Sequence, residues 1–321
     1  MNDVLTYIHP FLIDFLALSP FFIAIILSFI DGLIGFKAPP LWQIIKSIAA
    51  VFYKRLNREG RSVKARKTRG FIVLILFASA TLFMIRAAIP HIENTLYMSF
   101  FEGFILSGFI STSAVWVSSY KLNKTPDKNK IAPLTQDELL TADDYKLRKH
   151  IITYQARSLE RFLIAPLFFY FIGGLYLLVF AMTISALTFS SNFKTQHSRD
   201  YSQFIKRIDI VFTYIPARIT ALILCLISVF VPFASFNKTR STINQATKFN
   251  DPNAGWSLSA YAGSLDITLA GPALQEGKST DQPWVGPEKS SAKIEKQHVI
   301  KGLFLHFYAT IMIVAFCLFL N

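Results

Sequence analysis

Long apolar runs alternate with shorter polar stretches along the whole chain. Six of these runs approach or exceed the roughly 20 apolar residues that an α-helix needs to cross a bilayer. They cover residues 11–30, 70–89, 95–117, 162–189, 211–236 and 300–320. The pattern predicts an all-α integral membrane protein, a multi-pass helical bundle in which residues 1–321 form a single domain.

The fourth run, residues 162–189, leaves two structures open. It is long for one span, carries Pro166, and contains the pair Gly173–Gly174 near its middle. The run predicts either one tilted helix or a re-entrant hairpin with both ends on the same side of the membrane. Irregular backbone at membrane depth needs protein or a watery cavity around it, and hydropathy alone does not distinguish the two structures.

Three polar segments, residues 36–69, 120–160 and 237–299, lie between the runs. In the first, apolar residues recur at helical spacing from Leu41 to Leu56, which predicts an amphipathic interfacial helix. In the second, one apolar stripe among charged residues predicts a helix over 136–160. The third is a Gly/Pro-rich polar loop, and its tryptophans favour an ordered structure over an idle tail.

Composition excludes a soluble fold and charge predicts the orientation. Of the 321 residues 52% are hydrophobic and only 17% are charged, against about 25% in ordinary soluble domains. The net charge of +13 concentrates in residues 36–69, which hold ten basic residues and one acid. The positive-inside rule therefore predicts that 36–69 is cytoplasmic in a bacterial inner membrane, with the lipid bilayer as partner. Because this basic segment joins two apolar runs, nucleic acid is not expected as a partner.

Few general motifs of catalysis are present. The sequence has no phosphate-binding Gly-x-x-x-x-Gly-Lys loop and no His-Glu-x-x-His zinc motif, and its six histidines do not cluster, so any metal ligands stay unknown. Ionisable residues beside apolar runs are costly and often functional, which makes Asp31, Asp209 and Arg218 candidates; the alternative is an interfacial or helix-capping role. Around Gly255, the amide of Asn253 and the ring of Trp256 predict a tight turn that either binds a planar ligand or packs as an ordered loop.

Several short motifs, spaced over nearly the whole chain, resemble the CobD/CbiB family of cobalamin biosynthesis membrane proteins. They are Asp31-Gly-Leu-Ile-Gly35, Leu56-Asn-Arg-Glu-Gly-Arg-Ser62, Ala165-Pro-Leu-Phe168, Tyr214-Ile-Pro-Ala-Arg218, Pro252-Asn-Ala-Gly-Trp256, Leu269-Ala-Gly-Pro272 and Pro283-Trp-Val-Gly286. The resemblance implies ATP-dependent amide formation between a corrinoid carboxylate, cobyric acid, and aminopropanol or its phosphate. It implies ATP and Mg²⁺ as cofactors and a corrinoid as the bound partner.

The resemblance also implies roles for individual residues. Asp31 and Asp209 would be cation-binding carboxylates, with Arg218 as the third catalytic residue. The substrate would be held by Arg61, Asn253, Gly255 and Trp256. Arg61 and Arg218 would neutralise phosphate charge, and Asn253 with Trp256 would hold the acceptor.

The chain departs from the family pattern at several acidic positions. Where the family has a Glu-Asn pair followed by an acid, this chain has Arg157-Ser158 and Arg161, and the second acid of a paired Asp is Ile210. Loss of these carboxylates removes ligands for a divalent cation, so the sequence predicts reduced or lost activity. The segment Arg161–Phe168 also resembles AmpE, a relative associated with sensing linked to β-lactamase induction. The alternative function is therefore a non-catalytic membrane sensor on the same scaffold.

Overall fold

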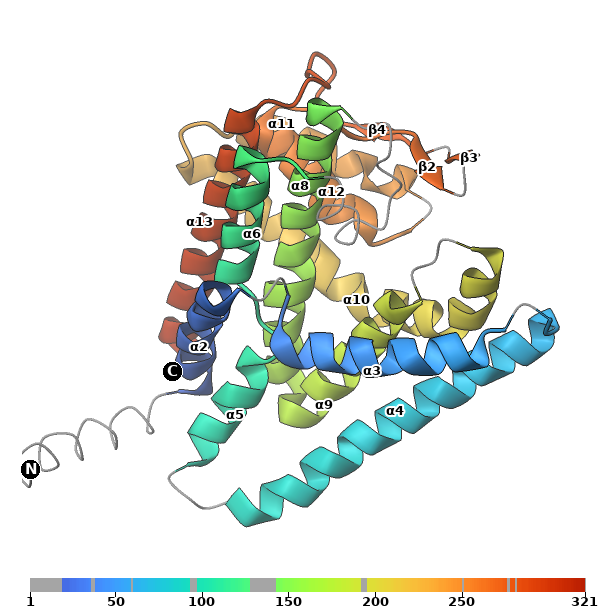
Figure 1. Cartoon of the computed structure of the whole chain (residues 1–321). Coiled ribbons are helices and arrows are strands. Elements are labelled where there is room, and N and C mark those ends of the chain that lie inside the picture. Colours follow the sequence, from blue (N-terminus) through green and yellow to red (C-terminus); the bar gives the residue numbers. More distant parts are fainter. Residues whose placement is uncertain are drawn as a thin grey trace, which may run out of the picture.

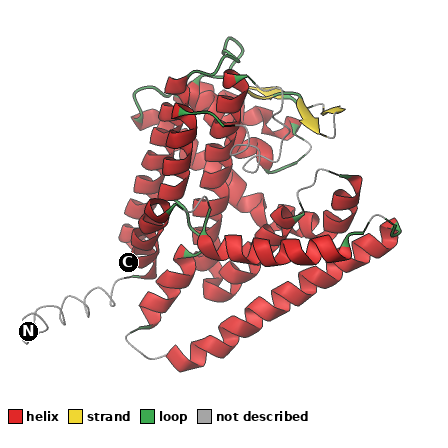
Figure 2. Ribbon diagram, in the orientation of Figure 1, coloured by secondary structure: helices red, strands yellow, loops and turns green. Residues whose placement is uncertain are grey.

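The computed structural model describes residues 19–35, 38–58, 60–92, 97–127, 143–191, 195–249, 251–275, 278–280 and 282–320. Helices make up most of the described chain, and short strands gather at one end of the molecule (Figures 1 and 2). The helices are α2 (Pro20–Ile34), α3 (Pro40–Leu56), α4 (Val63–Ile92), α5 (Met98–Ser107), α6 (Ser113–Lys124), α8 (Asp144–Leu159), η1 (Glu160–Ile164), α9 (Ala165–Ser190), α10 (Gln196–Phe230), α11 (Phe236–Ile243), η2 (Asn244–Lys248), α12 (Ala254–Leu265) and α13 (Lys296–Leu320). The strands are β1 (Leu269–Ala270), β2 (Ala273–Gln275), β3 (Lys278–Thr280) and β4 (Trp284–Val285).

The expected all-α multi-pass membrane fold is confirmed. Within the described residues four helical stretches are long and apolar enough to cross a bilayer, and α2 and α5 are shorter apolar helices. The four stretches are Val63–His91, Asp144–Ser190, Gln196–Phe230 and Lys296–Phe316. Their outward faces keep many large apolar side chains exposed, among them Phe83, Val211 and Phe230. In a bilayer these side chains lie against lipid tails, where exposure carries no hydrophobic cost.

Two groups of helices lie across one another. In Figure 1, α6, α8 and α13 stand side by side, whereas α3 and α4 run across the other end of the molecule. The long α10 connects the groups, since it packs along α4 near its start and against α12 farther on. The α4–α10 contact depends on Gly70, where a Cβ atom would lie 1.8 Å from the carbonyl oxygen of Tyr201. A side chain at Gly70 would therefore force these helices apart.

The fourth apolar run is a hairpin of two helical arms. In α9 the backbone leaves helical geometry at Gly173 and Gly174, and Gly174 has φ +58°, a conformation that favours glycine. Arg161 Nη1 lies 2.8 Å from Ser185 Oγ. A straight helix would separate residues 24 positions apart by about 36 Å. The chain therefore reverses direction at Gly173–Gly174, midway between Arg161 and Ser185.

The run at 95–117 differs from the expected single span. It forms α5 and α6, which are separated at residues 108–112. Here the carbonyl of Gly108 accepts hydrogen bonds from the amides of Leu41 and Trp42 at 3.0 and 3.3 Å, and the amide of Ser111 donates to the carbonyl of Phe162 at 2.9 Å. The backbone groups that would continue one helix are thus used to join the start of α3 and η1 to this connection.

Other boundaries also differ from the expectation. The fifth run was expected to cover residues 211–236, but α10 begins earlier, at Gln196, and ends earlier, at Phe230. It therefore joins the polar stretch before residue 211 to the apolar run in one helix. The segment 237–299 is largely folded, because it contains α11, η2, α12 and the start of α13. Residues 11–18 of the first run and 136–142 of the helix expected at 136–160 lie outside the described residues.

The predicted amphipathic helix corresponds to α3. Its apolar residues Ile44, Ile48 and Phe52 are exposed, while Trp42 and Ala49 are buried against the bundle. One face of α3 therefore packs on protein, and an apolar stripe beside it faces outward, as expected for a helix at a membrane interface.

Candidate functional site

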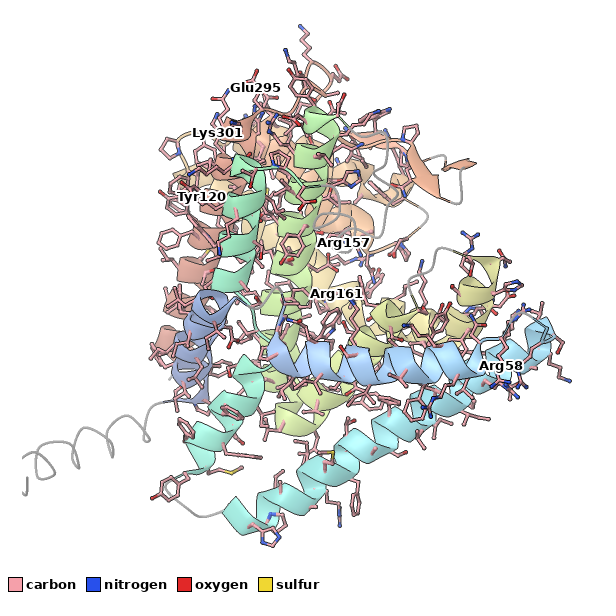
Figure 3. All side chains as sticks on the ribbon, viewed as in Figure 1. Arg58, Tyr120, Arg157, Arg161, Glu295 and Lys301 are labelled. Atoms are coloured by element: carbon pink, nitrogen blue, oxygen red, sulfur yellow. The ribbon has the colours of Figure 1, made fainter. Side chains whose placement is uncertain are left out.

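A π-helical turn places two charged side chains inside the bundle. Residues Glu160–Ile164 form η1, between α8 and α9, and both Glu160 and Arg161 are buried. A π turn adds a residue to the helical repeat and so redirects the side chains around it, and such turns are frequent at functional sites. Figure 3 shows Arg157, at the end of α8, close to Arg161 of η1. These residues form one side of the site.

Arg161 links both arms of the hairpin to α10. Its guanidinium donates to Asp209 on α10, with N–O distances of 3.3–3.4 Å, and to Ser185 Oγ on the returning arm. Ser185 Oγ also accepts a hydrogen bond from Trp42 Nε1 at 3.2 Å, and the guanidinium lies 4.4 Å from the ring centre of Phe189. Because Arg161 and Asp209 are both at least nine-tenths buried, each neutralises a charge that would be costly alone.

Two further carboxylates approach from other elements. Glu160 accepts a hydrogen bond from Ser257 Oγ of α12 at 2.8 Å. Asp251, just before α12, accepts from the amides of Asn253 and Ala254 at 3.1 and 3.2 Å. Nearby are the cations Arg157 of α8 and Lys206 of α10, whose Nζ lies 3.9 Å from Asp251. We call the residues Arg157, Glu160, Arg161, Lys206, Asp209 and Asp251 the polar cluster.

Beside the polar cluster, Arg218 is stacked between two aromatic rings. Its guanidinium carbon lies 3.2 Å from the ring centre of Tyr214 and 4.5 Å from that of Trp256. Asn253 ties α12 to α10, because its Nδ2 donates to the carbonyl of Ile210 at 2.6 Å and to Thr213 Oγ1 at 2.9 Å. Arg218 Nη1 reaches Asn253 Oδ1 at 3.5 Å. We call Tyr214, Arg218, Asn253 and Trp256 the arginine stack.

The structure brings together four of the seven residues singled out from the sequence. Asp209, Arg218, Asn253 and Trp256 lie on α10 and at the start of α12, which pack against each other. Gly255 lies on α12 too, but a Cβ atom there would lie 2.3 Å from the carbonyl oxygen of Ala246. It therefore allows the close approach of α12 and η2.

Asp31 and Arg61 lie elsewhere. Asp31 is near the end of α2, which packs on α5 and α6, and the next residue, Gly32, donates its amide to Ser113 Oγ. The Oδ2 atom of Asp31 is buried and has no hydrogen-bond partner among the described residues. Arg61 lies in the turn between α3 and α4, where its amide bonds to the carbonyl of Arg58. The labelled Arg58 is at the outer end of α3, far from Arg157 and Arg161 (Figure 3).

Comparison with known proteins identifies the family. The model of the family described as CobD/Cbib protein matches residues 23–305. The chain belongs to the CobD/CbiB family. It is 32% identical over 126 residues to cobalamin biosynthesis protein CobD of Photorhabdus laumondii, covering 39% of this chain and 40% of that protein. It is 27% identical over 150 residues to cobalamin biosynthesis protein CbiB of Salmonella typhimurium, covering 47% of each.

A longer alignment supports the same assignment. The chain is 25% identical over 248 residues to cobalamin biosynthesis protein CobD of Clostridium perfringens, covering 74% of this chain and 78% of that protein. The alignments with the Photorhabdus and Salmonella proteins span less than half of those relatives. No solved structure matches the chain. It is thus a membrane protein of a cobalamin biosynthesis family.

Two CobD/CbiB-like motifs that are separate in the sequence pair in the structure. Residues 269–272 and 283–286 contribute β1 and β4, with Leu269 opposite Val285 and Ala270 opposite Trp284. Gly271 has φ +79°, and a Cβ atom there would lie 2.4 Å from the Trp284 ring. Lys149 of α8 donates to the carbonyl of Ala270 at 2.7 Å and lies 5.0 Å from the Trp284 ring centre. These two motifs therefore form a ribbon held against α8.

The Mg²⁺ that the CobD/CbiB resemblance implies does not fit the polar cluster. Among the residues that the structure describes, no group of three or more His, Cys, Asp or Glu is placed to hold a metal ion. The carboxylates of Glu160, Asp209 and Asp251 are instead engaged by Ser257, Arg161 and backbone amides. Mg²⁺ is usually bound through one or two carboxylates together with substrate phosphates. These carboxylates already have protein partners.

Asp251 should make stability sensitive to acid. Burial favours its neutral form, but Arg157, Lys206 and the amides of Asn253 and Ala254 outweigh burial, so the pKa of Asp251 lies below the usual aspartate value. The stability that this carboxylate contributes is present above the unfolded-state pKa of about 3.9 and is lost as pH falls through the lower folded-state pKa. Asp251→Asn should therefore flatten the acid limb below about pH 4.

The measurement is unfolding of the detergent-solubilised protein, followed by tryptophan fluorescence between acidic and neutral pH. Glu288→Gln, which changes an exposed acid, serves as the matched control. An acid limb with the same slope in wild type and Asp251→Asn would contradict the assignment.

The site residues predicted from the sequence did not include Arg157, Glu160, Arg161 or Asp251. The available signal was an unusual density of ionisable groups at 157–161, directly before an apolar run, where charged side chains are costly. Arg157 and Arg161 entered only as departures from the family pattern. The ion pair of Arg161 with Asp209 depends on the π turn and on the packing of η1 against α10, which hydropathy does not predict.

Proposed function

We propose that this protein binds a corrinoid carboxylate on the CobD/CbiB scaffold but no longer joins it to aminopropanol or its phosphate. The observation that carries the proposal is that the three carboxylates of the polar cluster are engaged by the protein's own donors. ATP-dependent activation of a carboxylate needs groups that neutralise phosphate charge as it develops, commonly a divalent cation held by carboxylates. Carboxylates tied to guanidinium and amide groups are poor ligands for that cation.

The arginine stack supports binding of an anionic ligand. Among the described residues, Arg218 donates to the carbonyl of Tyr214 and to Asn253 Oδ1. Nη1 is the donor in both hydrogen bonds. Since a guanidinium has five N–H donors, the remaining donors are available to a ligand carboxylate. The half-buried Trp256 ring offers an apolar face beside this cation, as a large planar ligand would require.

The binding proposal predicts a large effect at Arg218. Cobyric acid should bind the purified wild-type protein saturably, and Arg218→Gln should weaken the affinity by about tenfold or more, since a charge-assisted hydrogen bond contributes about 1.5–3 kcal/mol. Binding is measured by titration calorimetry or by quenching of tryptophan fluorescence. Arg58→Gln, at the outer end of α3, is the control and should leave the affinity unchanged. Wild-type protein that takes up no corrinoid would contradict the proposal and favour the AmpE-like sensing role.

The second candidate is an active amide-forming enzyme. It is favoured by the family match over residues 23–305 and by the grouping of Asp209, Arg218, Asn253 and Trp256. A bacterial strain without its own CobD/CbiB enzyme separates the candidates when it is grown on cobyric acid. We expect this gene to give no growth despite confirmed expression in the membrane, and restored growth would establish the enzyme instead.

A further inference from the structure

The connection from α3 to α4 carries an excess of positive charge. Residues 54–69 hold eight basic residues and one acid, Glu59. Arg66 is the buried basic residue, and its guanidinium pairs with Asp200 of α10 at 3.4 Å. The other seven form no ion pair with an acid that the structure describes. We call these seven residues the basic elbow: Lys54, Arg55, Arg58, Arg61, Lys64, Lys67 and Arg69.

The basic elbow is held in shape by its own helices and by α10. The hydroxyl of Tyr53, near the end of α3, lies 2.6 Å from Ser198 Oγ, and its ring centre lies 5.3 Å from that of Tyr201. Arg69 of α4 donates from Nη1 to the carbonyl of Leu56, the last residue of α3, at 3.3 Å. The cations are therefore presented by packed helices, so a ligand that binds them needs to order less of the chain.

Exposed apolar side chains lie on both sides of the basic elbow. On α3 they are Ile44, Ile48 and Phe52, and near the start of α4 they are Phe71 and Ile72. Because α4 is long and apolar enough to cross a bilayer and α3 has the apolar stripe of an interfacial helix, the elbow between them lies at the level of the lipid headgroups. Cations at this level attract anionic lipid.

We infer that the basic elbow binds an anionic phospholipid, with Arg58, Arg61 and Lys64 on its phosphate and the apolar side chains of α3 and α4 on its acyl chains. Guanidinium and ammonium groups form charge-assisted hydrogen bonds with phosphate oxygens. A soluble phosphate compound would use the cations but not the apolar side chains beside them. The CobD/CbiB resemblance assigned Arg61 to a substrate phosphate, but this residue lies far from the polar cluster, whereas lipid phosphate would reach it where it is.

The test is thermal unfolding of the full-length protein in detergent, with added dioleoylphosphatidylglycerol or the zwitterionic dioleoylphosphatidylcholine. A ligand that binds the folded state raises the midpoint. Saturating phosphatidylglycerol should raise it by roughly 3 °C or more, and phosphatidylcholine should have little effect. High NaCl should reduce the shift, because salt screens exposed charges. Equal shifts with the two lipids would overturn the inference.

Glycerol 1-phosphate distinguishes lipid from soluble phosphate. It carries the phosphate charge without acyl chains, so it should give no shift at the concentration at which phosphatidylglycerol saturates. A shift equal to that of the lipid would mean that the basic elbow is a site for soluble phosphate compounds, and the inference would be wrong.

A triple variant removes cations from the basic elbow. Arg58→Gln, Arg61→Gln and Lys64→Gln are combined, since these side chains are accessible to solvent and none is used in a hydrogen bond to a described residue. The phosphatidylglycerol concentration that gives half of the shift should rise roughly tenfold or more, because each cation at an anionic lipid surface adds to the attraction. Arg58→Lys, Arg61→Lys and Lys64→Arg together keep the charge and should retain most of the wild-type response.

A second triple variant controls for net charge. Lys121→Gln, Lys124→Gln and Lys289→Gln remove three exposed cations, two of them from α6, and Figure 3 places Tyr120 of α6 far from Arg58. This protein should respond to phosphatidylglycerol as the wild type does. Equal weakening in the two triple variants would show a nonspecific response to net charge, and an unchanged response in the elbow variant would mean that the lipid binds elsewhere. Either result would overturn the inference.

The wild-type measurements decide the matter if the elbow variant does not fold. The comparison of phosphatidylglycerol, phosphatidylcholine and glycerol 1-phosphate needs no substitution, and the charge-keeping variant shows whether the cations act through their charge. None of these measurements involves a corrinoid, so the inference stands or falls separately from the proposed function.

Discussion

Replacing Arg161 by methionine is expected to lower the free energy of unfolding by about 3–5 kcal/mol, because it leaves the buried Asp209 carboxylate without its counter-charge. The same substitution removes the hydrogen bond to Ser185, which joins the returning arm of the hairpin to η1. Loss of one side chain therefore weakens both the η1–α10 contact and the hairpin closure. The measurement is denaturant or thermal unfolding of the protein in detergent.

A matched pair and a double variant control this prediction. Lys238 and Asp266 form an ion pair in which both side chains are about half exposed, so Lys238→Met should cost less than about 1 kcal/mol. Arg161→Met combined with Asp209→Leu removes both buried charges and should recover most of the loss. Equal destabilisation in the single and double variants would show that the effect comes from packing and not from the ion pair.

Gly255→Ala should be the second severe substitution. The added Cβ atom would lie 2.3 Å from the carbonyl oxygen of Ala246 and 2.7 Å from a ring carbon of Phe249, so α12 must move away from η2. Overpacking of this kind costs about 1–3 kcal/mol, and here the obstructing atom is backbone. Because Asn253 directly precedes α12 and Trp256 lies in its first turn, the shift should also disturb the arginine stack.

Unfolding midpoint and corrinoid binding are both measured for Gly255→Ala. Gly60→Ala is the matched control, since a Cβ atom at Gly60 meets nothing within 4 Å. A Gly255→Ala protein with wild-type stability would mean that η2 yields freely, and the tight α12–η2 contact would then not position the site.

The extent of the membrane fold follows from hydropathy, but the path of the chain does not. The apolar run at 162–189 and the glycine pair within it are visible in the sequence, yet they fit both a tilted helix and a hairpin. The contact of Arg161 with Ser185 decides for the hairpin, and that contact depends on tertiary packing. Similarly, the division of 95–117 into α5 and α6 depends on hydrogen bonds from α3 to Gly108, which periodicity does not contain.

Site residues that share a short sequence motif could be predicted, whereas contacts between elements far apart in the sequence could not. Asn253 and Trp256 lie in one short motif, and Arg218 lies in another, so sequence reasoning found them. Asp31 carries a similar local signal, but α2 packs on α5 and α6, away from the α10–α12 contact. The ion pair of Arg161 with Asp209 depends on η1 meeting α10, and in the sequence Arg161 stands where an acid was expected.

The central claim, that this CobD/CbiB family member binds a corrinoid carboxylate without converting it, is tested most directly by one reconstitution. Purified protein in lipid is incubated with cobyric acid, aminopropanol phosphate, ATP and Mg²⁺, and the corrinoids are analysed by mass spectrometry. Cobyric acid should be recovered unchanged from the protein-bound fraction. Appearance of the corrinoid amide, dependent on ATP and on Arg218, would contradict it.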